Sequence, residues 1–251
     1  MFDPRLSYRA TLIVLGSLFA VEFAALAISP VSRSTWVLEN VLLVALVAVL
    51  VATRRSFRFS RISYTMIFAF SCLHELGSHY TYSLVPYDAW AQRWLGFSID
   101  AALGFERNQF DRAVHFLYGL LLAYPIREIV LRIVDVRGVW GYLIPLDVTM
   151  STSMIYELIE WGAAELFGGE LGQAYLGTQG DVWDAHKDMA LASLGAVLAM
   201  GATLAINLAL QRDFAADWAH SLRVKHSEPL GEEVLARRLI DGEDGGAGAT
   251  D

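Results

Sequence analysis

The sequence predicts an all-α polytopic membrane protein, built as a bundle of six transmembrane helices. Hydrophobic residues make up 55% of its 251 residues and charged residues only 18%, which is more apolar than a soluble domain of this length requires. The apolar residues gather in six stretches close to the length of about 20 residues that a helix needs to cross the hydrocarbon core of a bilayer. Lys and Arg are concentrated in alternate loops, which indicates that the chain crosses a membrane repeatedly.

The six predicted spans follow one another with short or medium-length loops between them. The first contains the stretch ATLIVLGSLFAVEFAALAIS, which is too long for the core of a signal peptide, so we expect it to remain as a helix. The later spans are apolar but carry ionisable residues toward one end. The predicted spans cover residues 11–29, 36–53, 62–84, 112–134, 139–167 and 188–210.

The distribution of Lys and Arg predicts the orientation. The N-terminus, the loops after the second and fourth spans and the C-terminal tail together hold 14 of the 19 basic residues. Because basic loops stay on the cytoplasmic side, both termini are expected to lie inside, in the inner membrane of a bacterium. The loops at 30–35, 85–111 and 168–187 are then outside.

Residues 1–210 are expected to form the transmembrane domain and residues 211–251 a cytoplasmic tail. Phe214, Trp218 and Leu222 recur every four residues, as in a short amphipathic helix on a membrane surface. The acidic, Gly-rich end of the tail is expected to be disordered. The formal net charge of −8 argues against nucleic acid as a partner.

Ionisable residues inside the predicted spans gather near the outer ends of four of them. Such residues are unfavourable in a bilayer and usually mark a functional site. Many lie three or four positions apart, so that they project from one side of their helix. The candidate residues are Glu75 and His79 in the third span, Asp111, Arg112 and His115 at the fourth, Glu157 and Glu160 in the fifth, and Asp184, His186 and Asp188 at the sixth.

Carboxylate and imidazole groups from facing helices are the ligands that helix bundles use for Zn, Mn, Fe or Mg ions. The stretch HELGSH is not a zincin motif, because its two histidines lie about 140° apart on a helix. We expect Glu160 or Glu75 to act as a general base and Arg112 or Lys187 to offset negative charge on a substrate. The expected metal ligands are His79, Asp111, His115, Glu157, Asp184, His186 and Asp188.

Each candidate also has a structural interpretation. Asp111, Asp181 and Asp184 sit at helix starts, where a carboxylate can cap free N–H groups. His115 can be a hydrogen-bonded core residue, and Glu157 can belong to an interhelical ion pair. Asp188 lies one turn beyond any cap and therefore needs a buried partner. Capping thus leaves Asp188 unexplained.

Three long motifs resemble the YjdF-type family of bacterial inner-membrane proteins over about residues 36–205: HELGSHYTYSLVPYD, NQFDRAVHFLYGLLLAYPIREI and YELIEWGAAELFGGELGQAYLGTQGDVWDAHKDMALASLGA. DRAVHF is also similar to the Asp-Lys-x-x-His-Phe element of the VanZ-like proteins, which are associated with teicoplanin resistance. Arg112 replaces the Lys, which keeps the charge but changes the geometry. DAHKDMALASLGA resembles a later helix of that family. The resemblance implies a membrane fold and singles out Asp111, His115 and Asp188, but implies no reaction.

These observations predict an outward-facing metal-dependent membrane enzyme that acts on a lipid-linked or cell-envelope substrate and contacts membrane lipids. Two alternatives remain open. The polar cluster can be an ion-pair network in an accessory subunit of a larger membrane complex, or it can bind a cation or proton in a permeation protein.

Overall fold

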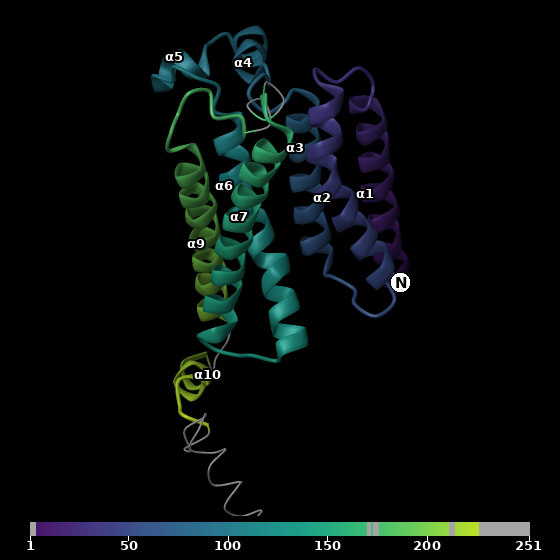
Figure 1. The fold of residues 1–251 in the computed structure, drawn as a ribbon. Coiled ribbons are helices and arrows are strands. Elements are labelled where there is room, and N and C mark those ends of the chain that lie inside the picture. The colour runs from purple at the N-terminus through teal and green to yellow at the C-terminus, as the bar shows by residue number, and fades with distance from the viewer. Residues whose placement is uncertain (1–3, 170–171, 173–175, 211–213, 226–251) are drawn as a thin grey trace, which may run out of the picture.

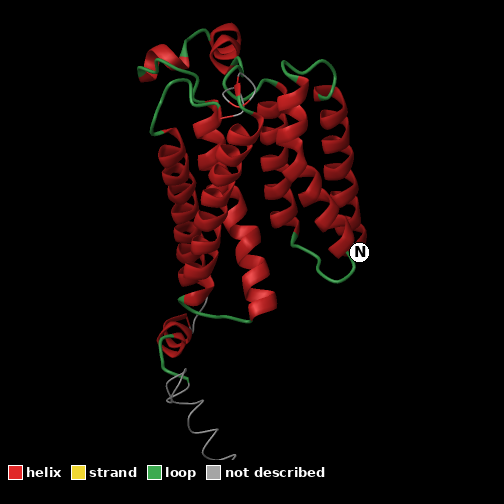
Figure 2. Ribbon diagram, in the orientation of Figure 1, coloured by secondary structure: helices red, strands yellow, loops and turns green. Residues whose placement is uncertain are grey.

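The computed structural model describes residues 4–169, 172, 176–210 and 214–225, and the regular elements in these ranges are helical. The prediction of an all-α protein is therefore confirmed (Figure 2). Figure 1 shows one group of long helices, α1, α2 and α3, beside a second group, α6, α7 and α9. The short helices α4 and α5 lie at one end of the bundle, and α10 lies at the opposite end (Figure 1).

Each predicted span coincides with one long helix. The start of α1 precedes its predicted span by several residues, and α3 ends before its own. A short π-helix, η1 (Val130–Val134), continues α6. The long helices are α1 (Pro4–Leu26), α2 (Arg33–Thr53), α3 (Arg61–His79), α6 (Phe110–Ile129), α7 (Trp140–Phe167) and α9 (Asp184–Leu210).

Three of the described helices are long and apolar enough to cross a membrane, at Ser7–Leu26, Arg33–Thr53 and Asp184–Leu210. The other three long helices, α3, α6 and α7, carry much of the ionisable sequence that the candidate site requires. Their polar residues therefore reduce the apolar character by which a membrane span is recognised.

Local sequence explains where several helices begin and end. The Ser32 side chain accepts a hydrogen bond from the Thr35 amide at 3.3 Å and caps α2. Ser60 caps α3 in the same way, through the Ser63 amide at 3.2 Å. The helices α4 (Tyr87–Leu95) and α5 (Ile99–Leu103) end at Gly96 and Gly104, whose positive φ angles glycine adopts readily.

Helices α6 and α9 approach each other closely through glycine. A Cβ atom added to Gly119 would lie 1.8 Å from the Ala192 carbonyl oxygen, and one added to Gly195 would lie 2.1 Å from the Phe116 carbonyl oxygen. Small residues allow membrane helices this proximity. The contact holds the middle of α6 against the first half of α9.

The predicted tail helix is present as α10 (Phe214–Ser221). Phe214 and Trp218 pack beside Tyr142 of α7, with ring centroids 6.4 and 6.1 Å from that ring. The apolar side of α10 therefore contacts the bundle. The predicted disordered end of the tail lies outside the described residues.

Candidate functional site

Four candidate residues from three helices meet at the end of the bundle that carries α4 and α5. Asp111 and His115 lie one turn apart on α6, and one Asp111 carboxylate oxygen is 3.6 Å from His115 Nε2. Glu157 of α7 places Oε1 3.6 Å from the same nitrogen. Asp188 of α9 completes a set with Asp111 and His115 whose ligand atoms all lie within 4.8 Å of one another. We call these four residues the acid–histidine cluster.

The acid–histidine cluster contains buried oxygen atoms that accept no hydrogen bond from the described residues. Asp188 is only 2% exposed. Its Oδ1 atom and Oε1 of Glu157 have no hydrogen-bond partner among the described residues. A buried carboxylate oxygen without a partner is unfavourable by about 1–3 kcal/mol or more. A cation placed between these donors would satisfy them, and carboxylate and imidazole ligands suit Zn, Mn or Fe ions.

A second group of charged residues adjoins the cluster. The Arg107 guanidinium donates to Asp184 Oδ1 at 2.5 Å, and Arg112 lies 3.3 Å from the same oxygen. Arg112 also pairs with Asp181, which accepts a hydrogen bond from Lys187 at 2.6 Å. We call these five residues the Arg–Asp network. It joins the start of α6 to the start of α9.

Asp181 combines ion pairing with the capping that its position predicts. Its Oδ1 atom accepts a hydrogen bond from the Trp183 amide at 3.0 Å, just before α9. The hydrogen bond from Lys187, followed by that from the Trp183 amide and by the Arg112 side chain, holds the pKa of Asp181 below its usual range. Asp181 therefore remains ionised near neutral pH and keeps its pairs with Arg112 and Lys187.

Several predicted site residues lie away from the acid–histidine cluster. Glu75 accepts a hydrogen bond from the Trp36 indole at 2.8 Å, toward α2. His79 lies 2.6 Å from the Leu26 carbonyl oxygen at the end of α1. His186 is exposed and packs its ring against Trp183, with centroids 5.2 Å apart. Asp184 faces Arg107 and Arg112, as described above.

Glu160 lies one helical turn after Glu157 on α7. Glu160 is partly buried, and Asp111, Glu39 and Glu157 are close enough to it to interact electrostatically. Glu160 therefore lies beside the acid–histidine cluster and near Glu39 of α2.

The structure adds Glu39, which the sequence prediction omitted, and places His74 beside it. Glu39 of α2 is 4% exposed and accepts a hydrogen bond from the Tyr156 hydroxyl at 3.1 Å. His74 contacts the Glu39 carbonyl oxygen at 3.2 Å and the Tyr82 hydroxyl at 2.5 Å. Glu39 is detectable in the sequence as an acid within an apolar span, whereas no pattern in the sequence singles out its partner Tyr156.

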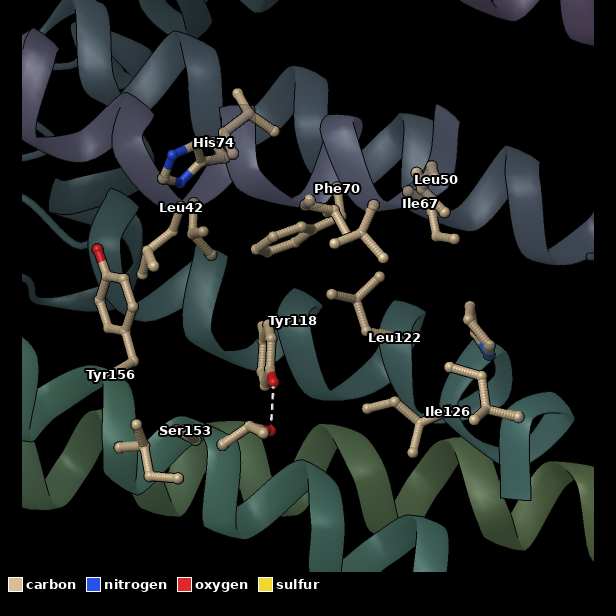
Figure 3. A pocket seen from close by; sticks show the side chains of 18 of the residues that line it. Leu42, Leu50, Ile67, Phe70, His74, Tyr118, Leu122, Ile126, Ser153 and Tyr156 are labelled. Carbon is tan, nitrogen blue, oxygen red and sulfur yellow. Dashed lines mark hydrogen bonds between the residues drawn. The ribbon is translucent and has the colours of Figure 1, made fainter. Parts of the chain in front are cut away.

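A groove of about 610 Å³ reaches the acid–histidine cluster. Its walls are mostly aliphatic and aromatic side chains of α2, α3, α6 and α7, several of which Figure 3 shows facing one another. Asp111, His115, His74, Tyr82 and Tyr156 line it at the α4–α5 end. The cluster therefore adjoins a largely apolar space.

Comparisons with known proteins agree with this architecture. A family profile described as "Predicted membrane protein (DUF2238)" matches residues 11–208. The inner membrane protein YjdF of Escherichia coli (strain K12) is 39% identical over 172 residues, which cover 68% of this chain and 78% of that protein. No solved structure shows a significant match. The resemblance to YjdF-type proteins and the predicted inner-membrane location are confirmed. The chain belongs to the DUF2238 family of membrane proteins.

Proposed function

We propose that this protein is a metal-dependent membrane enzyme that acts on a lipid-linked or cell-envelope substrate. The observation that carries the proposal is the acid–histidine cluster, in which Asp188 and Glu157 each have a buried oxygen without a hydrogen-bond partner among the described residues. The ligand atoms of Asp111, His115 and Asp188 lie within 4.8 Å of one another. We assign the metal to these three residues and Glu157.

A divalent ion held there would polarise a substrate oxygen and favour deprotonation of water. Glu160, one helical turn after Glu157 on α7 and close to Asp111, is the general base in this proposal. The contact of Glu75 with Trp36 favours a packing role for Glu75. The pairs of Arg112 with Asp181 and Asp184 favour a role in joining α6 to α9.

The proposal includes six spans with both termini in the cytoplasm, residues 1–210 as the transmembrane domain and residues 211–251 as a cytoplasmic tail. The placement of the basic residues supports this orientation. The α4–α5 end of the bundle, with the acid–histidine cluster, then faces outward. A substrate would approach from the outer leaflet or the periplasm.

Metal analysis of the purified protein tests the function. We expect about one Zn, Mn or Fe ion per chain by inductively coupled plasma mass spectrometry, since one set of donors converges. His115→Ala and Asp188→Asn should lose the ion. His186→Ala should retain it, because His186 is exposed and packs on Trp183. Absence of metal in the parent protein, with the variants folded and equally stable, would refute the proposal.

The second candidate function is that of an accessory subunit of a larger membrane complex. The Arg–Asp network favours it, because Arg107, Arg112 and Lys187 are all paired with carboxylates. The groove and the unpartnered oxygens favour the enzyme instead. Copurification of a stoichiometric partner from native membranes, with metal absent, would support the subunit. Proton or cation uptake into vesicles without metal retention would support a permeation protein.

A further inference from the structure

The groove is formed between two layers of helices. Leu42 and Leu50 of α2 and Phe70 of α3 face Tyr118 and Leu122 of α6 across it (Figure 3). Its volume of about 610 Å³ falls within the range of roughly 300–1,000 Å³ that is typical of pockets for one small molecule. Its lining is apolar over most of its length, so it favours a hydrocarbon chain.

The two ends of the groove differ in chemistry. At the α4–α5 end, the lining includes Asp111 and His115 of the acid–histidine cluster. At the other end, it consists of residues such as Phe57, Ile129 and Ile133. An occupant that matches both ends has a polar group joined to a long apolar chain.

The length of the groove restricts the kind of chain. Asp111 and Ile129 both line it and lie 18 positions apart on α6. At 1.5 Å per residue, this separation is roughly 27 Å. The hydrocarbon core of a whole bilayer is roughly 30 Å thick. The acyl chain of a glycerophospholipid occupies one leaflet, about half of this distance, whereas a polyprenyl chain can extend along the whole groove.

The groove is open to the side. Val49, Ile155 and Ile159 line it and are 57%, 49% and 41% exposed, respectively. Large apolar side chains that are exposed on a membrane protein face lipid. A chain can therefore enter laterally from the bilayer and need not pass through water.

We propose that the groove binds the isoprene units nearest the phosphate of a long-chain polyprenyl phosphate, with the phosphate at the acid–histidine cluster and the rest of the chain in the bilayer. The proposal names the substrate class of the proposed function. It rests on that function, because the phosphate and the carboxylates are both negatively charged and a bound cation must lie between them. We choose a polyprenyl chain because the groove has apolar walls, opens laterally to the bilayer and is roughly 27 Å long.

Binding of undecaprenyl phosphate and of the shorter farnesyl phosphate tests the proposal. The full chain would be reconstituted in phosphatidylglycerol nanodiscs, with Mn²⁺ or with EDTA, and bound lipid counted by native mass spectrometry. We expect undecaprenyl phosphate to bind at least about tenfold more tightly than farnesyl phosphate. EDTA should weaken both but leave the preference for the long chain, because the apolar walls contain no metal ligand.

Filling the groove should abolish the preference. Leu122→Trp narrows it at its centre, and Ile155→Trp narrows it at its open side. Leu198→Trp is the control, because Leu198 does not line the groove and is 49% exposed, like Ile155. We expect about tenfold weaker binding of undecaprenyl phosphate in the first two variants and parent-like binding in the control.

The outcomes separate the two proposals. Equal affinity for both chain lengths, occupancy by phosphatidylglycerol alone, or parent-like binding in folded Leu122→Trp and Ile155→Trp would overturn the groove assignment. Long-chain binding that depends on the groove in a protein without metal would support the groove assignment and refute the metal-dependent enzyme. His115→Ala should lose metal and keep the chain-length preference.

Discussion

Asp188 is a buried carboxylate with one oxygen that has no hydrogen-bond partner among the described residues. Without a cation, Asp188→Asn should stabilise the protein or leave it unchanged, because it removes a charge that is poorly compensated in the interior. With metal, the parent should gain about 2.7 kcal/mol at a ligand concentration of 100 times Kd, and the variant should gain little. Thermal unfolding checks this: the variant should be at least as stable as the parent in EDTA, and the parent should be the more stable protein in Mn²⁺ or Zn²⁺.

His186→Ala is the matched control for Asp188→Asn, because both residues lie in the first turns of α9 but His186 is exposed. The control should respond to metal as the parent does. If the melting temperature of Asp188→Asn differs from that of the parent by the same amount in EDTA and with metal, Asp188 has a structural role and is not a ligand.

Asp184 depends on Arg107 for its closest ion pair, at 2.5 Å, and its side chain is only 4% exposed. Arg107→Gln should destabilise the protein by about 1–3 kcal/mol, because Arg112 at 3.3 Å compensates only in part. Lys187→Gln should cost less than about 1 kcal/mol, since the Lys187 side chain is 49% exposed. Thermal unfolding in detergent compares the stability of Arg107→Gln and Lys187→Gln. Equal losses of stability in the two variants would contradict the buried role of Arg107.

The sequence identified the residues of the acid–histidine cluster but could not separate them from their neighbours. Asp184 and Asp188 lie four positions apart on one helix, yet Asp184 meets two arginines and Asp188 meets none within hydrogen-bonding distance. Which acid meets Arg107 depends on how the loop at 104–109, between α5 and α6, lies against the start of α9. Helical periodicity contains no information on the path of that loop. The same limit applies to Glu75, whose partner Trp36 comes from another helix.

At the scale of elements, the contact of α6 with α9 depends on glycine. Gly195→Ala should destabilise the bundle by about 1–3 kcal/mol or more, because the new Cβ would lie 2.1 Å from the Phe116 carbonyl oxygen, so the helices must separate. Gly201→Ala on the same helix meets nothing within 4 Å and should be neutral or stabilising, since alanine favours helix. Apparent melting temperatures of the two variants check this difference.

Because Asp111 and His115 precede Gly119 on α6, and Asp188 precedes Gly195 on α9, separation of the helices should also weaken metal binding in Gly195→Ala. A Gly195→Ala variant that melts and binds metal like Gly201→Ala would show that the helices can relax apart at little cost.

The positions of the long helices could be predicted because apolar length is a local property of the sequence. Helices α4 and α5 are absent from the sequence prediction, which treats residues 85–111 as a loop outside the membrane. Both helices are short, and Asp88 connects them by accepting hydrogen bonds from Ser98 and the Asp100 amide at 3.0 Å. Such an arrangement depends on contacts between segments and leaves little periodicity in the sequence.

At the scale of the whole molecule, the polar cluster and the apolar groove lie against each other. Spacing alone indicated that acids and histidines gather at one depth, but it could not indicate a groove, because its walls come from four helices whose relative rotation is set by packing. Glu39 shows the same limit: it is one acid in an apolar span, and only the fold places it beside Tyr156.

The orientation of the bundle determines which compartment the acid–histidine cluster serves. We expect Trp94→Cys, at a 75% exposed position in α4, to react with a membrane-impermeant maleimide in intact spheroplasts, in a Cys72→Ser background. Arg55→Cys, in the basic loop after α2, should react only after the membrane is permeabilised, because basic loops stay in the cytoplasm. The opposite pattern would place the cluster on the cytoplasmic side and exclude a periplasmic substrate. Equal reactivity of both positions in intact spheroplasts would contradict a chain that crosses the bilayer between them.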